Sequence, residues 1–215
     1  MLNIIDNVSE VAQTEEHIKE TAKKVFFQKG ILNATTQQIA DEAGVNRALI
    51  HYYFRSRDLL FKKVLEEAVN ETRTKIDSIF ESDEPFKTKI SKYLDVFIDR
   101  NAQFPYIQNF IFTEIMQDPE KMKEHFSRKR NHLMKHIVPP LKNEIENGGM
   151  QPVDPEHFIV NMMSMCSYPL IAKPFIQNMF SYDDKAYKKF LKERKQVIYK
   201  VLFNEELPEE SQTSK

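Results

Sequence analysis

The residues best suited to chemistry lie in one stretch, residues 35–60, which reads TTQQIADEAGVNRALIHYYFRSRDLL. The pattern indicates a short amphipathic helix, a tight turn at Gly44, and a second short helix that opens after Asn46. Such a second helix can enter the major groove of DNA with its first residues toward the base edges. If its apolar positions pack inward, four side chains point outward: Arg47, Ala48, His51 and Tyr52.

Basic charge is concentrated at the same place, although the whole chain has a formal net charge of only −1. Between positions 47 and 63 a single acidic residue, Asp58, stands among the following basic residues: Arg47, Arg55, Arg57, Lys62 and Lys63. A protein that binds DNA needs such a local excess to neutralise phosphates. The composition therefore favours a DNA-binding segment within a nearly neutral chain.

Histidine and cysteine residues offer a second kind of chemistry. His125, His132 and His136 fall on one face of a predicted helix, so a metal site is conceivable. The His-Glu-x-x-His pattern is missing, because Leu133 follows His132. We therefore expect half-exposed histidines, or histidines that line a ligand pocket, and no metal. The single cysteine, Cys166, excludes an internal disulfide, and we expect it to be a small buried residue.

Motifs for catalysis and for cofactor binding are missing from the sequence. There is no G-x-G-x-x-G, no Walker motif and no cysteine pair. Acidic residues are mixed with lysines, as on solvated helix faces. We therefore expect no enzyme and no cofactor. No apolar run approaches the roughly 18 residues that cross a bilayer, and no secretory signal is visible, so we expect a cytoplasmic protein without a membrane partner.

The elements that must position these residues are helices. Glycine is scarce, with 4 in 215 residues, and long stretches consist of good helix formers. Thr35 with Gln38 resembles a capping box, and Ser56 is a suitable N-cap for a fourth helix. The expected helices, with Pro139 and Pro140 interrupting one of them, cover residues 14–29, 35–43, 46–54, 56–80, 85–103, 105–116, 119–147, 155–171 and 183–203.

The expected fold is all-α, with a three-helix helix-turn-helix head for DNA binding and a helical bundle for ligand binding and dimerisation, about nine helices in all. The acidic end reads as a disordered tail. The expected division is an N-terminal extension at 1–13, the DNA-binding domain at 14–60, the ligand-binding and dimerisation domain at 61–204, and the tail at 205–215.

The C-terminal body is rich in methionine and aromatic residues. Most of them must form the core, but such an interior can also adapt around an apolar or aromatic guest. The absence of a dense cluster of charge among them argues against a highly charged effector. The candidate pocket residues are Phe97, Phe104, Phe110, Phe126, Met134, Met162 and Cys166.

Residues 15–60 resemble the N-terminal signature of the tetracycline-repressor (TetR) family. Glycine, threonine, aromatic and basic positions fall in register over this span. The matching positions are Ala22, Phe26, Gly30, Thr35, Ile39, Ala40, Ala43, Gly44, Val45, Ile50, His51, Tyr52, Tyr53, Phe54, Arg57 and Leu60. The body carries no comparable motif, although its helices and the segment GGMQPVDPEHF are similar to the family's layout.

The resemblance implies a set of DNA contacts. Thr35 and Thr36 would bind a phosphate at a helix N-terminus, and Tyr53 and Arg57 resemble the family's phosphate anchors. His51 departs from the commoner tyrosine and could read a base or contact the backbone. The implied contacts in chain order are Thr35, Thr36, Asn46, Arg47, Ala48, His51, Tyr52, Tyr53 and Arg57.

The expected function is that of a homodimeric repressor, released from a palindromic operator in double-stranded DNA by a small apolar or aromatic effector. Two subunits would associate through residues 154–171 and 183–203 in a four-helix interface. An activator of the same fold, or a regulator that needs no effector, is the alternative. An enzyme is the disfavoured third reading.

Overall fold

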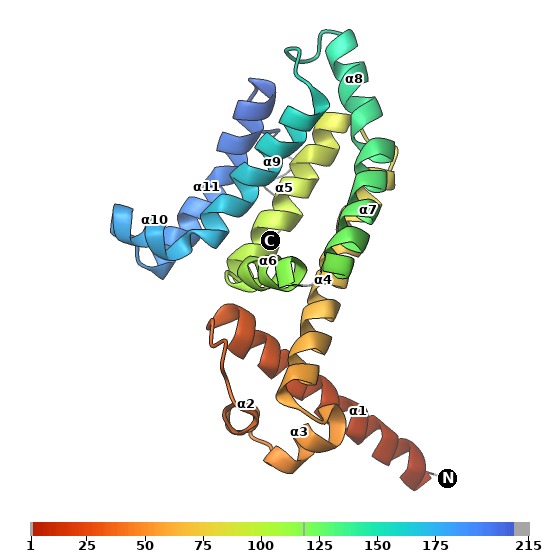
Figure 1. Ribbon diagram of the computed structural model, residues 1–215, viewed down its shortest axis with the longest axis vertical. Coiled ribbons are helices and arrows are strands. Elements are labelled where there is room, and N and C mark those ends of the chain that lie inside the picture. The colour runs from red at the N-terminus through yellow and green to blue at the C-terminus, as the bar shows by residue number, and fades with distance from the viewer. Residues whose placement is uncertain (1, 118, 209–215) are drawn as a thin grey trace. The chain divides into compact units, whose positions relative to one another are not determined.

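The computed structural model describes the backbone of residues 2–117 and 119–208; the side chains of residues 1–11, 114–119, 121–122, 124–126 and 129 lie outside the description. Within these limits the protein consists of helices, labelled α1 to α11 with one π-helical turn η1, and no strand is found in the described part (Figure 1). The all-α class with a helix-turn-helix head and a helical bundle is confirmed, and the number of helices is close to the predicted nine.

The chain forms two compact units. The head unit comprises Met1–Glu71 and Phe104–Ile107, and the body unit comprises Thr72–Gln103 and Gln108–Lys215. The elements of the head are α1 (Leu2–Lys23), η1 (Lys24–Gln28), α2 (Thr36–Ala43), α3 (Arg47–Phe54) and the first part of α4 (Arg57–Glu81). Helix α1 begins twelve positions before the predicted start at residue 14, because no glycine or proline interrupts residues 2–13.

The head has its own core, in which Phe26, Ile39 and Ile50 are completely buried. They come from η1, α2 and α3, so the three elements pack around one centre. Gly30 follows η1 with φ of 71°, and a Cβ there would lie 2.8 Å from the ring of Tyr106. The backbone N–H of Tyr106 donates to the carbonyl of Phe27 at 3.1 Å. Only glycine suits both the left-handed backbone and this close approach.

Local capping fixes the ends of α2 and α3. The backbone N–H of Gln38 donates to the Thr35 hydroxyl at 3.2 Å, and the Thr35 N–H donates to the Gln38 side chain at 2.8 Å. Gly44 ends α2 in the left-handed conformation, with φ of 65°. Asn46 then caps α3 by accepting from the Ala48 N–H at 2.8 Å. The predicted capping box, glycine turn and N-cap are all confirmed.

The body is built from the remaining helices. These are the end of α4, α5 (Phe86–Gln103), α6 (Ile107–Gln117), α7 (Pro119–His136), α8 (Val138–Glu146), α9 (Pro155–Ile171), α10 (Lys173–Phe180) and α11 (Asp184–Phe203). The predicted interruption at Pro139 and Pro140 is confirmed, since α7 ends at His136 and α8 begins at Val138. Helix α10 is absent from the predicted set, because its eight residues are too few to show a helical period.

Helices α5, α9 and α11 pack together to form the centre of the body. Their fully buried residues include Leu94, Phe158 and Ile198. Leu207 also belongs to this core, and the Lys87 ammonium donates to Glu205 at 2.6 Å. The segment predicted to begin a disordered tail at residue 205 is therefore held against the body as far as residue 207. Residues 209–215 of that predicted tail lie outside the described part.

Candidate nucleic-acid interface

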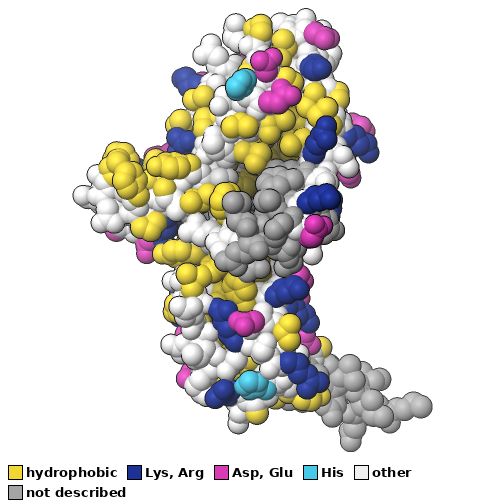
Figure 2. Space-filling view, in the orientation of Figure 1, with side chains coloured by type: hydrophobic (Ala, Val, Ile, Leu, Met, Phe, Trp, Pro, Cys, Tyr) yellow, Lys and Arg dark blue, Asp and Glu magenta, His cyan; other side chains and the backbone are white. Residues whose placement is uncertain are grey.

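Helix α3 presents one polar face to solvent and buries the other. Ile50 and Phe54 are buried in the head, whereas the four side chains predicted to point outward are exposed: Arg47, Ala48, His51 and Tyr52. The exposure of Tyr52 reaches 67%, which is unusual for a large aromatic side chain without a partner molecule. Figure 2 shows Lys and Arg among the exposed side chains of the head.

Tyr52 and Tyr53 form an edge-to-face pair with ring centroids 5.0 Å apart. Tyr53 is half-buried and also packs against Phe54, with 6.1 Å between the ring centroids. Tyr53 is therefore the more buried ring of the pair, and Tyr52 is the more exposed. Because this pairing already restricts the Tyr52 side chain, the side chain would lose less rotamer freedom on binding a partner molecule.

Arg47 is oriented by a contact from the preceding helix. Its Nε donates to the Thr36 hydroxyl at 3.2 Å, and Thr36 is buried at the N-terminus of α2. The two terminal NH₂ groups of the guanidinium are the ones suited to a bidentate contact. Thr36 therefore acts by positioning Arg47, while the exposed Thr35 remains at the helix N-terminus where a phosphate can bind.

His51 has one ring nitrogen bound within the protein. Nδ1 lies 3.1 Å from the carbonyl oxygen of Arg55 and must donate to it, because a carbonyl only accepts. In a neutral ring the exposed Nε2 is then a hydrogen-bond acceptor. Arg55 itself has φ of 65°, a conformation that costs a non-glycine residue about 1 kcal/mol.

Arg57, which the sequence analysis predicts to be a phosphate anchor, makes several contacts within the head. Its guanidinium donates to the backbone carbonyls of Leu32 and Ala34, the latter at 3.4 Å, and to the carboxylate of Asp58 at 2.9 Å. It also lies over the ring of Phe26, 5.1 Å from the centroid. These contacts fasten the loop before α2 to the start of α4. The prediction could not include them, because the carbonyls lie 23 and 25 positions away in the sequence.

Ion pairs and one histidine brace the helices behind α3. Lys19 of α1 pairs with Glu67 of α4 at 2.9 Å, and Lys63 of α4 pairs with Glu15 at 2.8 Å. His17 donates through Nε2 to the carbonyl of Ala43, the last residue of α2, at 2.9 Å. The positive charge of Lys63 is thus partly neutralised within the head, so the basic excess is smaller than the sequence suggests.

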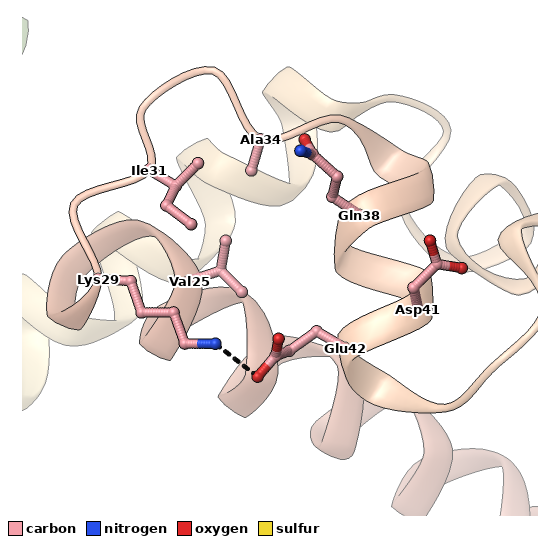
Figure 3. A pocket seen from close by; sticks show the side chains of 7 residues that line it. All are labelled: Val25, Lys29, Ile31, Ala34, Gln38, Asp41 and Glu42. Atoms are coloured by element: carbon pink, nitrogen blue, oxygen red, sulfur yellow. Dashed lines mark hydrogen bonds and ion pairs between the residues drawn. The ribbon is translucent and has the colours of Figure 1, made fainter.

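A hollow of about 380 Å³ lies between η1, the following loop and α2 (Figure 3). Its lining residues are Val25, Lys29, Ile31, Ala34, Gln38, Asp41 and Glu42. Lys29 and Glu42 face each other across it and form an ion pair of 2.7 Å. Because the opposite charges are satisfied by one another and the apolar lining is small, we assign no ligand to this hollow.

The candidate ligand-pocket residues do not converge as predicted. Met162 and Cys166 are buried in the body core, with Phe97 packed against it, and Phe110 is buried in α6. Phe104 is buried too, but in the head unit. Met134 is 56% exposed and cannot line an interior pocket, because it lies on the solvent side of α7. The side chain of Phe126 lies outside those that the structure describes.

A cluster of aromatic rings in the body was not among the predicted pocket residues, apart from Phe97. Tyr93 of α5 lies 5.9 Å from Phe80 of α4 and 5.7 Å from Phe97, measured between ring centroids. His132 of α7 packs edge-on against Phe80, with 5.7 Å between the ring centroids. The ring centroids of His132 and His136 are 4.9 Å apart. We call these five residues the ring cluster. In the sequence, only the spacing of the two histidines, one helical turn apart, indicated this cluster.

Burial shapes the acid–base behaviour next to the ring cluster. It raises the pKa of the Cys166 thiol to about 12 and raises that of the neighbouring Tyr93 hydroxyl as well. It lowers the pKa of His132, against the opposing effect of Asp77. All three groups are therefore uncharged at neutral pH. Among the described side chains no group of three potential ligands could hold a metal ion, and no described helix is suited to cross a membrane.

An exposed recognition helix, entered through a glycine turn and supported by a small helical core, defines the helix-turn-helix class of DNA-binding proteins. Residues 18–64 match the family "Bacterial regulatory proteins, tetR family", and residues 65–204 match the "YcdC-like protein, C-terminal region". The second match alone spans more than half of the chain. The chain thus belongs to the tetR family and is a DNA-binding transcriptional regulator of that family.

Known regulators share its sequence at a modest level. The chain is 26% identical over 165 residues to the uncharacterized HTH-type transcriptional regulator YfiR of Bacillus subtilis, covering 69% of this chain and 79% of YfiR. It is 22% identical over 149 residues to the HTH-type transcriptional regulator RutR of Escherichia coli K12, covering 69% of this chain and 70% of RutR.

Solved structures share the fold. The ketosteroid transcriptional regulator KstR2 of Mycobacterium tuberculosis aligns with a TM-score of 0.64 at 15% identity, covering 90% of this chain and 96% of KstR2. PfmR of Thermus thermophilus, a TetR family regulator, aligns with a TM-score of 0.58 at 16% identity, covering 85% of this chain and 93% of PfmR.

Proposed function

We propose that this chain is a repressor that acts in the cytoplasm as a homodimer on a near-palindromic operator. The carrying observation is the exposed polar face of α3, whose first side chain, Arg47, is held in place by Thr36. The two α3 helices of a dimer would enter successive major grooves, with half-sites about one helical turn apart. Activation instead of repression would use the same interface.

Base contacts in this proposal come from the outward face of α3. Arg47 is suited to guanine, whose O6 and N7 accept from a guanidinium. With Nδ1 donating to the Arg55 carbonyl, Nε2 of His51 can accept from an amino group of cytosine or adenine when the ring is neutral, and it can donate to a phosphate when the ring is protonated. Ala48 and Tyr52 are placed to contact thymine methyl groups or the backbone. Asn46 is committed to capping α3, so its contact would come from the backbone.

Phosphate contacts would come from Thr35 at the N-terminus of α2, from Tyr53, and from exposed basic side chains beside α3. Arg55 and Lys62 are both exposed, and we assign phosphate contacts to them. A non-glycine residue at positive φ is costly, and this cost at Arg55 supports a function for its side chain.

The dimer would form on the face made by α9, α10 and α11. These helices carry a series of exposed apolar side chains: Val160, Tyr168, Ile171, Phe175, Met179, Phe180, Val197 and Val201. Figure 2 shows hydrophobic side chains gathered at the end of the body that Figure 1 labels α10. An apolar surface of this extent is typical of a face covered by another molecule, and a second copy satisfies it by symmetry.

The effector would bind in the body and weaken DNA binding through α4. This helix begins at Arg57 in the head unit and ends at Glu81 in the body unit, so one continuous helix runs from one unit into the other. A coupling free energy of about 1–3 kcal/mol would lower operator affinity about 5- to 150-fold. A small uncharged molecule suits the uncharged state of Tyr93 and His132.

The proposal is tested by selecting DNA from a random pool with the full chain and measuring affinity by fluorescence anisotropy at moderate salt. We expect a palindromic consensus with two half-sites, bound at least about 1000-fold more tightly than scrambled DNA. The segment upstream of the chain's own gene is the first natural sequence to try. Equal affinity for selected and scrambled DNA would refute sequence-specific regulation.

A further inference from the structure

The ring cluster brings together helices that are distant in sequence. Phe80 ends α4, Tyr93 and Phe97 lie one turn apart on α5, and His132 and His136 lie one turn apart on α7. Cys166 of α9 is buried in the same hydrophobic core as Tyr93. Aromatic faces and edges, together with the uncharged thiol, form surroundings suited to a flat ring system.

Two buried hydrogen-bond acceptors of the body, on α5 and α7, have no partner in the described part of the chain. Asn101 lies two turns beyond Tyr93 on the same face of α5 and is 1% exposed. Its amide nitrogen donates to the carbonyl of Phe97 at 2.6 Å, whereas its Oδ1 has no hydrogen-bond partner among the described residues. The buried Nε2 of His132 likewise has no partner in the described part of the chain.

The chemistry of His132 makes its Nε2 an acceptor. Asp77 Oδ1 lies 3.5 Å from Nδ1, and a carboxylate beside a ring nitrogen favours the proton on that nitrogen. Burial lowers the pKa of His132, so the ring is neutral and Nε2 keeps its lone pair. Among the neighbouring groups, Asp77 and Glu81 raise the pKa of His132, whereas His136 and Lys135 lower it. Burial, and not an excess of negative charge, therefore disfavours an anionic ligand.

Buried acceptors without a donor are unfavourable, and native proteins normally satisfy them. Donors carried by a bound molecule would satisfy such acceptors, as at Asn101 and His132. We propose that the effector is an uncharged, flat aromatic molecule that stacks on the ring cluster and donates O–H or N–H hydrogen bonds to His132 Nε2 and Asn101 Oδ1. This inference deepens the proposed function, on which its regulatory meaning rests.

The test uses matched pairs of small probes that differ only in their donor. Phenol is compared with anisole, 2-naphthol with 2-methoxynaphthalene, and 2,6-dihydroxynaphthalene with its dimethyl ether, and 2-naphthoate serves as the anionic analogue. Binding to the full chain is measured by calorimetry and by the shift in melting temperature. We expect at least one hydroxylated probe to bind about tenfold more tightly than its ether and than the anion. Equal binding within every pair, or preference for the anion, would overturn the inference.

Two variants locate the donor contacts. His132→Phe keeps an aromatic ring without the acceptor, and Asn101→Leu keeps the approximate volume without the amide. Each should reduce binding of the preferred hydroxylated probe about tenfold while leaving the ether unchanged. The exposed pair His157→Phe and Asn143→Leu provides matched controls, and circular dichroism checks folding. Unchanged probe binding in both folded variants would overturn the assignment of His132 and Asn101 as acceptors. If either variant fails to fold, the probe pairs measured on the unaltered chain decide whether a donor is preferred.

Operator binding is measured separately, so the two proposals fail in different ways. A donor preference without sequence-specific DNA binding would uphold the ligand chemistry and refute the regulatory function. Specific DNA binding without any donor preference would refute the ligand chemistry and leave the regulatory function standing. When both hold, the preferred probe should lower operator affinity by at least about fivefold.

Discussion

Arg47 enters the proposed interface with its guanidinium already oriented, because its Nε donates to the Thr36 hydroxyl at 3.2 Å. Arg47→Ala should cost about 1–3 kcal/mol in operator binding while affinity for scrambled DNA changes little. Thr36→Val should weaken operator binding less, and it should have no further effect in the Arg47→Ala background. Anisotropy titrations measure these affinities, with Arg73→Ala as the exposed control. An equal loss for all sequences would make Arg47 a phosphate contact.

Arg55 allows backbone strain to be separated from charge. Because its φ is 65°, Arg55→Gly should raise the free energy of unfolding by up to about 1 kcal/mol. Arg55→Ala keeps the strain and removes the charge. Both variants should bind DNA more weakly and reduce the slope of log affinity against log salt by about 0.9 for each head, or about 1.8 for a dimer on two half-sites. Urea unfolding measures the free energy of unfolding, and salt titrations measure the slope. An unchanged slope in both variants would show that Arg55 does not contact a phosphate.

At the scale of elements, Arg57 joins the loop at residues 31–34 to α4. Arg57→Met keeps the apolar stem but removes the donors to Leu32 and Ala34, and it should lower the free energy of unfolding by about 1–3 kcal/mol. The salt slope of DNA binding should stay the same. Thermal unfolding and salt titrations check both, with Arg73→Met as control. Full stability with a reduced slope would instead support the phosphate anchor that the sequence suggests.

How far the elements could be predicted depends on the range of the interactions that form them. The cap at Thr35, the turn at Gly44 and the cap at Asn46 use partners within four residues, so the local sequence determines them. The contacts of Arg57, and the packing of Tyr93 and of His132 against Phe80, require distant segments to come together. Aromatic composition alone therefore predicted pocket residues that the fold scatters, among them Phe104 in the head and the exposed Met134.

At the scale of the whole molecule, the proposal requires two copies of a 25.4 kDa chain. Val201 of α11 is 64% exposed, and Phe175 of α10 is 55% exposed. Burying a charge on an apolar interface is costly, so Val201→Glu and Phe175→Glu should each shift the chain from dimer to monomer. Light scattering after gel filtration measures the mass. Phe112→Glu, on the exposed side of α6, is the control that should remain dimeric.

The same variants connect assembly to DNA recognition. A dimer holds its second head close to the second half-site once the first is bound, which raises affinity by about 10²- to 10⁴-fold over a single head. Monomeric Val201→Glu should therefore lose that factor on the full operator and bind an isolated half-site as the unaltered chain does. Anisotropy on both DNAs makes the comparison. If the variant is monomeric and still binds the full operator with undiminished affinity, a single chain suffices and the dimer is not the DNA-binding form.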